Sequence, residues 1–379
     1  MKKVAIIQRV LPHYRVAFFH GLREALVKDG IELELFYGQE YPGTVPKTVD
    51  LNADWAHRLN NHYSLLLGVE LVWQPCLKPL RDTDLVIVEQ ANRLMINYIL
   101  LFSRWISKRL KLAYWGHGRN MQADASWNWR ESLKRLLTNN VDWWFAYTAM
   151  SAKTVISGGF PVERMTIVQN TIDATALTRA ADALSAAQLD GLRAELGIEA
   201  SDKVGVFCGG MYADKKLDFL LEACAAIRAR APNFHVVLIG NGPEQDKVEA
   251  AAARWPWLHY VGPVYGPERV AYFKLGRALL MPGLVGLAIV DSFVTGTPIF
   301  TTDLPSHSPE IAYLQNGMNG MMTDFSIEAY ADAVVAYLED GIAQEKLERG
   351  CAESARLYSL DNMVGNFAAG IKNCLAVER

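Results

Sequence analysis

The sequence lacks three features that would place it outside the cytosol. Its five cysteines are scattered without a C-x-x-C spacing, which favours a reducing compartment over a disulfide framework. Only a short apolar run lies between Lys3 and Gln8, too little for a secretory signal. No apolar run reaches the roughly 18 to 20 residues that span a bilayer. We therefore expect a cytoplasmic chain that does not cross a membrane.

Long polar stretches are also scarce. Hydrophobic residues make up 51% of the 379 residues and charged residues 21%, which is ordinary for a folded globular protein. The length exceeds what one core usually fills, so two domains are expected.

The net charge is small, at -3, but it is divided unevenly along the chain. Residues 1–180 contain 22 lysines and arginines against 16 acidic residues, whereas residues 181–379 contain 16 against 25. A basic first half suggests an anionic partner there, either a phosphorylated substrate or a membrane surface. Chance surface composition would give the same split.

Short β-rich apolar runs alternate with amphipathic stretches, a pattern that predicts two doubly wound α/β domains in tandem. In the first half the predicted strands are 4–7, 33–37, 85–88, 112–115, 143–147 and 165–168, with helices at 17–27, 95–108 and 131–137. In the second half the predicted strands are 204–207, 236–239, 258–261, 278–281 and 299–302, with helices at 217–228, 246–254, 268–275 and 287–294. Residues 174–200 carry no strand signal and are predicted to form a helical linker.

Glycine-rich turns follow the second-half strands, where α/β sheets bind their ligands. Backbone N–H groups of Gly240-Asn241-Gly242-Pro243-Glu244 could hold a phosphate at a helix start, although a tight turn without a ligand fits equally well. The spacing is not a dinucleotide fingerprint, because the third glycine is missing.

Two charged residues in the same half are candidates for nucleotide binding. Lys215 follows Gly209-Gly210 and could offset the charge of a leaving diphosphate. Asp291, flanked by apolar residues on a predicted helix, could accept both hydroxyls of a ribose. Solvated surface charge is the alternative for each.

The first half offers polar residues at its own strand ends. His117 and Arg119 lie in Trp115-Gly116-His117-Gly118-Arg119-Asn120, where a core histidine is the alternative to a functional one. His13, Arg15 and Glu89 follow other strands and are candidates for the acceptor side, with loop packing as the alternative.

The second-half motifs resemble the donor half of family 4 of the retaining glycosyltransferases. The resemblance is carried by 209–215, 240–244, 282–298, Ser308-Pro309-Glu310 and 316–320, and covers most of residues 160–325. It implies a GT-B fold, in which two Rossmann-like domains face each other across a cleft. The expected domains are an acceptor-binding domain at 1–180, completed by a C-terminal crossover helix at 360–379, and a nucleotide-sugar domain at 195–359.

The resemblance also implies roles for individual residues. Lys215 matches the lysine that contacts the donor diphosphate, Asp291 the carboxylate that holds the ribose, and His117 the histidine that faces the sugar. The remaining donor-binding positions are Gly209, Gly210, Gly240, Asn241, Gly242, Pro263, Gly283 and Leu287.

Two positions depart from the family pattern. Gly210 stands where the family has an arginine, and Gly283 where it has the first glutamate of a pair. We expect Arg119 or Arg15 to supply the missing positive charge.

The expected function is transfer of a sugar from a UDP- or GDP-sugar, with retention, to a glycan or lipid-linked glycan during surface polysaccharide assembly. An impaired homologue that only binds nucleotide, and a sugar-nucleotide epimerase, are the alternatives. No metal, further cofactor or nucleic-acid partner is expected. The stretch 95–111, with Arg93, Arg104, Lys108, Arg109 and Lys111, suggests peripheral contact with the inner face of an anionic membrane, and a core-facing helix with a solvated face is the alternative.

Overall fold

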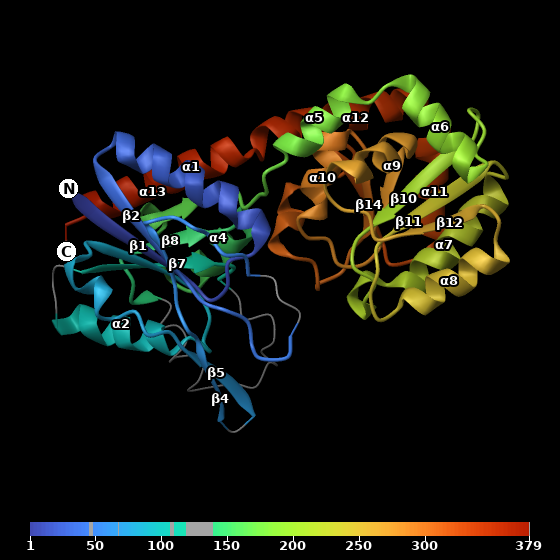
Figure 1. Ribbon diagram of the computed structural model, residues 1–379. Helices are drawn as coiled ribbons and strands as arrows, with labels where there is room; N and C mark the ends of the chain where they lie inside the picture. Colours follow the sequence, from blue (N-terminus) through green and yellow to red (C-terminus); the bar gives the residue numbers. More distant parts are fainter. Residues whose placement is uncertain (45–47, 67, 107–109, 119–138, 379) are drawn as a thin grey trace. The chain divides into compact units, whose positions relative to one another are not determined.

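The computed structural model describes residues 1–44, 48–66, 68–106, 110–118 and 139–378. Contacts divide the chain into two units, the first comprising Met1–Asp173 with Leu360–Arg379 and the second Ala174–Ser359 (Figure 1). Within the described ranges, no helix is long and apolar enough to cross a membrane.

The first unit is built on a seven-stranded parallel sheet with the order β3-β2-β1-β6-β7-β8-β9. Its strands are β1 (Lys2–Gln8), β2 (Ile31–Tyr37), β3 (Ala56–Arg58), β6 (Leu85–Glu89), β7 (Lys111–Gly116), β8 (Trp143–Ala146) and β9 (Met165–Ile167). A separate antiparallel hairpin is formed by β4 (His62–Leu66) and β5 (Val69–Trp73).

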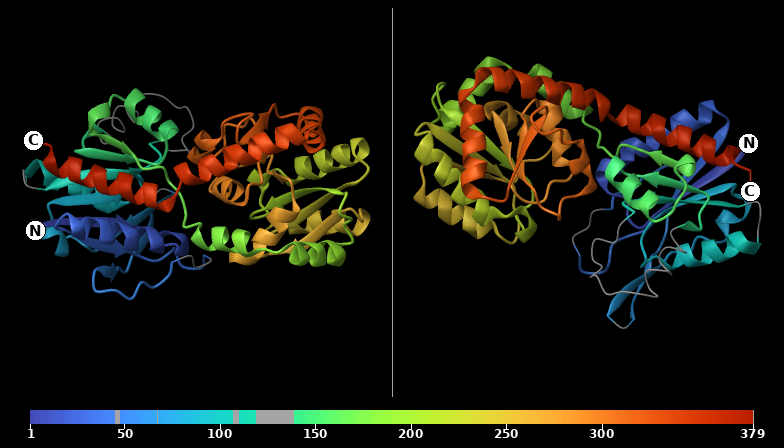
Figure 2. Two further views of the ribbon diagram at one scale, coloured as in Figure 1. Left: turned by 90° about the horizontal axis from the view of Figure 1, so that it is seen from above. Right: turned by 180° about the vertical axis from the view of Figure 1, so that it is seen from behind.

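Helices cover both faces of this sheet because alternate residues of each strand point to opposite sides. Val4 and Ile6 of β1 enter the core beneath α1 (Val16–Lys28) and α13 (Leu360–Ala376), which lie side by side (Figure 2). Ala5 and Ile7 enter the core beneath α2 (Met95–Ile106) and α4 (Ala149–Ser157).

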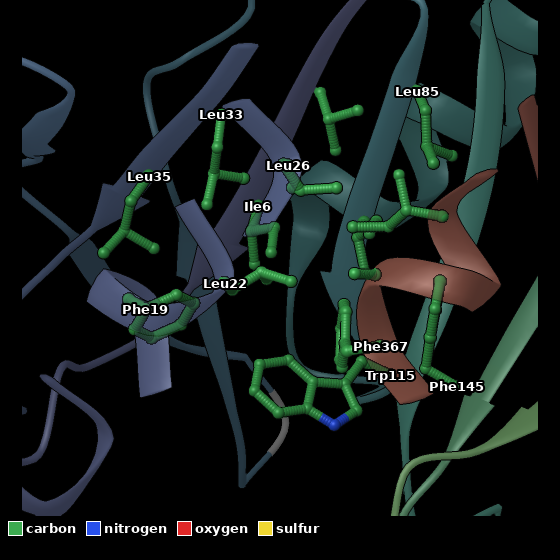
Figure 3. Packing of buried hydrophobic residues seen from close by; sticks show 14 of the residues in the cluster. Ile6, Phe19, Leu22, Leu26, Leu33, Leu35, Leu85, Trp115, Phe145 and Phe367 are labelled. Carbon is green, nitrogen blue, oxygen red and sulfur yellow. The ribbon is translucent and has the colours of Figure 1, made fainter. Parts of the chain in front are cut away.

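The C-terminal helix α13 is an integral part of the first unit. Its Phe367 ring stacks on Phe145 of β8 with ring centroids 4.3 Å apart and meets the Trp115 ring of β7 edge-on at 4.9 Å (Figure 3). The crossover helix expected at 360–379 therefore completes the core of the N-terminal sheet.

The second unit holds a six-stranded parallel sheet with the order β12-β11-β10-β13-β14-β15. Its strands are β10 (Lys203–Cys208), β11 (Phe234–Ile239), β12 (Leu258–Gly262), β13 (Ala278–Leu280), β14 (Ile299–Thr302) and β15 (Gly320–Thr323). Its helices are α5 (Thr175–Ala183), α6 (Ala186–Leu196), α7 (Leu217–Arg230), α8 (Gln245–Arg254), α9 (Val270–Leu275), α10 (Ala288–Thr295), α11 (Ile327–Glu339) and α12 (Gly341–Leu357). The order reverses between β10 and β13, as in doubly wound nucleotide-binding sheets.

Every predicted strand is present, and the expected pair of doubly wound α/β sheets is confirmed. The sequence did not predict β3, β4, β5 and β15, of which β3 and β15 are short and the β4–β5 hairpin is largely exposed. The helix predicted at 131–137 lies outside the described residues.

The stretch expected to link the domains forms two helices that pack within the second unit. Leu177 of α5 is buried, and α5 lies against α9 and α10. Ser185 and Gln188 form a reciprocal capping box at the start of α6, and Gly197 ends it with φ 64°. Residues 174–194 therefore pack with the second unit, and the units meet in sequence at Asp173.

Candidate functional site

The candidate site of the second unit lies where its strand order reverses. The loop after β13 meets the 3-10 turn Ala213–Lys215, because Leu284 donates its backbone N–H to the Asp214 carbonyl at 2.8 Å. This brings Lys215 next to the Pro282–Gly286 turn, and Gly209 lies beside Lys215 and Met281, at the point where α/β sheets bind nucleotides. We call this region the switch-point site.

Lys215 is a buried cation of the switch-point site, with 5% of its surface exposed. Its Nζ donates a hydrogen bond to the Leu284 carbonyl at 2.6 Å and lies 3.8 Å from the sulfur of Met281. Burial lowers the pKa of Lys215 to about 8, against the opposing effect of the Asp214 carboxylate. Since an ammonium has three N–H donors, the contact with Leu284 leaves donors for an anion.

Asp291 is also buried here, in α10, with 4% of its surface exposed. Its Oδ1 accepts a hydrogen bond from Nη2 of Arg269 at 2.9 Å. Burial raises the pKa of Asp291 to about 6, and the Arg269 guanidinium opposes that rise. The carboxylate is therefore mostly ionised at neutral pH.

Arg269 is a functional candidate that sequence reasoning missed. Its Nε is buried and has no hydrogen-bond partner in the described ranges. The charges of Arg269, Asp291 and Lys215 all act on the pKa of the Cys208 thiol, which burial raises to about 11. These three charged side chains therefore gather around the carboxyl end of β10.

The glycines of the 240–244 segment allow two loops to approach each other. Gly240 has φ 141° and Gly242 φ 154°, and a Cβ on either would overlap with the backbone of Gly209 or Met211. Backbone hydrogen bonds join the loops, from Met211 N–H to the Asn241 carbonyl at 2.8 Å and from Glu244 N–H to the Met211 carbonyl at 2.9 Å. This geometry supports the tight-turn interpretation of the motif.

Neighbouring groups fill the space at both departures from the family pattern. A Cβ at Gly210 would lie 2.7 Å from the Tyr212 ring, where an arginine side chain would begin. A Cβ at Gly283 would overlap with the backbone of Asp214 and Lys215. The arginine and glutamate of the family pattern are therefore absent from positions 210 and 283, but no empty space remains there for their side chains.

The other predicted donor residues border this region. Asn241 and Pro263 are exposed after β11 and β12, and Leu287 is the half-buried residue that precedes α10. His307, which the sequence did not single out, joins two strand-end loops: its Nδ1 accepts from Val285 N–H at 3.0 Å and its Nε2 donates to the Thr302 carbonyl at 2.7 Å.

In the first unit, Arg15 and His117 lie at the strand ends around two aromatic rings. The guanidinium of Arg15 lies 4.7 Å from the Trp115 ring centroid and 5.6 Å from that of Tyr147. The His117 ring meets Tyr147 edge-on at 4.3 Å. Burial, and then the charge of Arg15, lower the pKa of His117 to about 4, so its imidazole is neutral at pH 7.

Glu89 is the last residue of β6, at the same end of the sheet, and accepts the Arg9 backbone N–H at 2.9 Å. Burial raises its pKa, whereas Arg9, Arg15 and Arg93 lower it. His13 is exposed in the 3-10 turn before α1. Arg119 lies outside the described residues.

The cations expected to face a membrane have partners within the first unit. Arg104 forms two hydrogen bonds with Asp142, at 2.7 and 3.0 Å. Lys111 donates to three carbonyls at the end of α13, and Arg93 pairs with Glu70 at 3.0 Å. Lys108 and Arg109 are not described. Arg104 and Lys111 are therefore occupied within the unit, whereas the Arg93 side chain stays 47% exposed beside Glu70.

In the part of the chain that the structure describes, no group of three or more His, Cys, Asp or Glu side chains could hold a metal ion. The charged groups of the switch-point site can supply N–H donors to an anion, from Lys215 and Arg269, and carboxylate acceptors to hydroxyl groups, from Asp291.

Comparison with known proteins places this site within a known domain. Residues 202–340 match the family model described as glycosyl transferases group 1. A D-inositol 3-phosphate glycosyltransferase from Nocardioides sp. is 25% identical over 192 residues, which are 45% of this chain and 41% of that protein. The matched region thus spans less than half the length of the curated relative.

Solved structures match over almost the whole chain. HepE from Anabaena in complex with UDP has a TM-score of 0.68 at 15% identity, covering 98% of this chain and all of HepE. A glycosyltransferase from Rickettsia africae has a TM-score of 0.69 at 11% identity, covering 99% and 100%. At these identities the matches establish the fold alone, and they confirm the expected GT-B class of two Rossmann-like domains.

Proposed function

We propose that this chain, whose residues 202–340 are a group 1 glycosyl transferase domain, transfers a sugar from a nucleoside-diphosphate sugar to a glycan or lipid-linked glycan. The second unit would bind the donor and the first the acceptor. The observation that carries the proposal is that two buried side chains of opposite charge lie at the switch-point site. Lys215 can bind an anion, and Asp291 can accept hydrogen bonds from hydroxyl groups.

Lys215 would stabilise the leaving diphosphate. Its ammonium is held in place by the Leu284 carbonyl and is shielded from water, so its charge acts more strongly on a nearby phosphate than it would in bulk solvent. Because it is fixed before the reaction begins, it needs no reorganisation as negative charge develops.

Asp291 would hold the ribose of the nucleotide. Arg269 occupies its Oδ1 and helps to keep the carboxylate ionised, while an ionised carboxylate still has acceptor sites for hydroxyl groups. A ribose 2′-hydroxyl favours a UDP- or GDP-linked donor over a dTDP-linked one. HepE, which shares the fold, has been solved with UDP-glucose, with a TM-score of 0.66.

In the first unit, His117 would face the donor sugar, with His13, Arg15 and Glu89 on the acceptor side. The neutral imidazole of His117 can hydrogen-bond sugar hydroxyls without placing a second cation beside Arg15. We propose retention by front-face displacement, with the leaving diphosphate taking the proton from the acceptor. Surface polysaccharide assembly is the process we propose, on the inner face of the cell membrane.

A nucleotide-binding homologue with impaired transfer is the second candidate. The observation that favours it is the filled space at Gly210 and Gly283, where the family pattern has an arginine and a glutamate. Donor that is bound but neither hydrolysed nor transferred would support this candidate.

The experiment is a thermal-shift screen of the full chain against UDP-, GDP- and dTDP-sugars, followed by product analysis with each donor that binds. A donor at a hundred times its dissociation constant stabilises a protein by about 2.7 kcal/mol, enough for a clear shift. Stabilisation by one donor class, with sugar release or transfer, supports the proposal. No stabilisation by any nucleoside-diphosphate sugar would overturn it.

A further inference from the structure

Arg15 is a buried charge for which the described residues supply no counter-ion. It is 4% exposed, and its only hydrogen bond in the described part of the chain is a 4.0 Å contact from Nη1 to the thioether sulfur of Met363, a weak acceptor. No carboxylate oxygen of the described residues lies within the 4.0 Å that defines an ion pair with it. Buried charges in proteins are normally paired, so we expect an anion to bind beside this arginine.

Two further polar atoms beside Arg15 are buried and lack partners in the same described ranges. They are Nε1 of Trp115 and Nδ1 of His117. Figure 3 shows the Trp115 ring at the margin of the labelled core, with its nitrogen directed away from the other side chains. An indole N–H can only donate, and a neutral imidazole can donate from Nδ1. Leaving such buried groups unsatisfied is destabilising, because they lose their hydrogen bonds to water without gaining others.

The side chains that carry these groups lie together. Arg15 lies over the Trp115 ring at 4.7 Å, and both Arg15 and His117 contact Tyr147, at 5.6 and 4.3 Å. Arg15 also acts on His117 electrostatically, since its charge lowers the pKa of the imidazole.

The surroundings do not neutralise the guanidinium. Glu89 is a nearby carboxylate, but Arg9, Arg15 and Arg93 all act on its pKa, and it accepts a hydrogen bond from the Arg9 backbone. Arg93 also pairs with Glu70. Among the described residues, Glu89 therefore faces the charges of both Arg9 and Arg15, and one negative charge does not balance two positive ones. The aromatic rings stabilise the guanidinium face without cancelling its charge.

We propose that Arg15, Trp115 and His117 form an oxyanion site at the strand ends of the first sheet, which takes a phosphate group. The guanidinium fork and the indole N–H supply donors, and the aromatic walls exclude water from the contact. The phosphate group could belong to a phosphorylated acceptor or to the diphosphate of the sugar donor. Only this choice rests on the proposed function; the anion site itself does not.

The first test uses inorganic phosphate and the full chain, by thermal shift and isothermal titration at constant ionic strength with chloride as the reference anion. Phosphate should bind the wild type, and Arg15→Gln should weaken that binding by about 10- to 100-fold, since hydrogen bonds to charged groups contribute about 1.5 to 3 kcal/mol. Arg23→Gln is the matched control, because Arg23 also stacks over a tryptophan of this unit, Trp55 at 5.1 Å. Phosphate binding should survive that change.

Two further variants keep the test decisive if Arg15→Gln does not fold. Arg15→Lys retains the positive charge but loses the planar guanidinium with its paired N–H donors, and it should keep part of the affinity for phosphate. His117→Ala removes one polar partner from a half-buried position and should weaken phosphate binding several-fold. Phosphate that does not bind the wild type, or that binds Arg15→Gln or His117→Ala as tightly as the wild type, would overturn the proposal.

The second test identifies the source of the phosphate by repeating the titration with saturating UDP, or GDP if that is the nucleotide bound. Unchanged phosphate binding assigns the site to an acceptor, whereas competition assigns it to the donor diphosphate. A chain that binds phosphate through Arg15 but no nucleoside-diphosphate sugar would leave the anion site standing and refute the proposed function. The opposite pattern would refute the anion site alone.

Discussion

Arg269 and Asp291 form an ion pair at the carboxyl end of the second sheet, with Nη2 and Oδ1 2.9 Å apart. The Asp291 side chain is 6% exposed and the Arg269 side chain 21%. Arg269 is the residue that immediately precedes α9, and Asp291 lies in α10. The ion pair therefore links these two helices next to Lys215. The pair therefore has a structural effect, and under the proposed function it would also position Asp291 for the nucleotide.

Removing Arg269 should destabilise the fold because it leaves a buried carboxylate unpaired. Arg269→Ala should lower the free energy of unfolding by about 2 to 4 kcal/mol at pH 7. The loss should shrink toward pH 5, since the pKa of Asp291 is already raised to about 6 and protonation removes the unpaired charge. Urea denaturation at both pH values measures this.

The control for that variant is Arg277→Ala, which breaks the exposed 3.3 Å pair with Glu348 in the same unit. An exposed pair contributes about 0 to 1 kcal/mol. Equal destabilisation in the two variants would contradict the role given to Arg269.

Gly283 should not tolerate a side chain, since a Cβ would overlap with the backbone beside Lys215. Gly283→Ala should lower the free energy of unfolding by about 1 to 3 kcal/mol and weaken nucleotide binding by displacing the Lys215 turn. Gly191→Ala is the contrast, because nothing lies within 4 Å of the added carbon in α6. It should stabilise the chain by up to about 1 kcal/mol. Chemical denaturation of both variants measures the difference, and a neutral Gly283→Ala would show that the loop can move freely.

The His235–His259 pair should make stability depend on pH. Their rings stack, with Nδ1 of His235 2.9 Å from Nε2 of His259. Burial, and then the charge of His235, lower the pKa of His259 from its ordinary 6.5 to about 4. The unfolded chain therefore takes up a proton between these pH values while the folded chain does not, and stability is lost as the pH falls through that window.

Replacing one ring tests this dependence. His259→Gln should flatten the fall in unfolding free energy between pH 7 and 4, since about one proton fewer is taken up on unfolding. Burial also lowers the pKa of His235, against the opposing charge of Asp202, whose carboxylate lies 3.5 Å from Nε2. His235 should therefore keep a smaller dependence of the same sign. A slope unchanged from the wild type would rule out the histidine pair as its source.

The regular parts of the fold could be predicted from the sequence because buried parallel strands are short apolar runs. The runs at 204–207 and 236–239 became β10 and β11 almost unchanged. The β4–β5 hairpin gave no such signal, since Leu65, Leu66 and Val69 are exposed and pack into no core.

The site was predictable only in part. Lys215 and Asp291 lie in segments whose order and spacing resemble a known family, but Arg269 does not. It stands 22 residues before Asp291, and as a charged residue at a helix start it is indistinguishable in sequence from a solvated side chain. Similarly, the sequence shows that side chains are missing at Gly210 and Gly283, but not that Tyr212 and the Lys215 turn fill the space.

The central claim, that Lys215 acts on the diphosphate of a nucleotide-sugar donor, is tested most directly by the transfer or hydrolysis rate of Lys215→Ala. The control is Lys247→Ala, an exposed lysine paired with Asp218 and Glu244 in the same unit. With the donor identified by thermal shift, we predict that Lys215→Ala lowers the rate by roughly 10² to 10³, as the loss of one preorganised electrostatic contact does, while Lys247→Ala stays near the wild type. A Lys215→Ala variant that folds and keeps a near-normal rate would contradict the account.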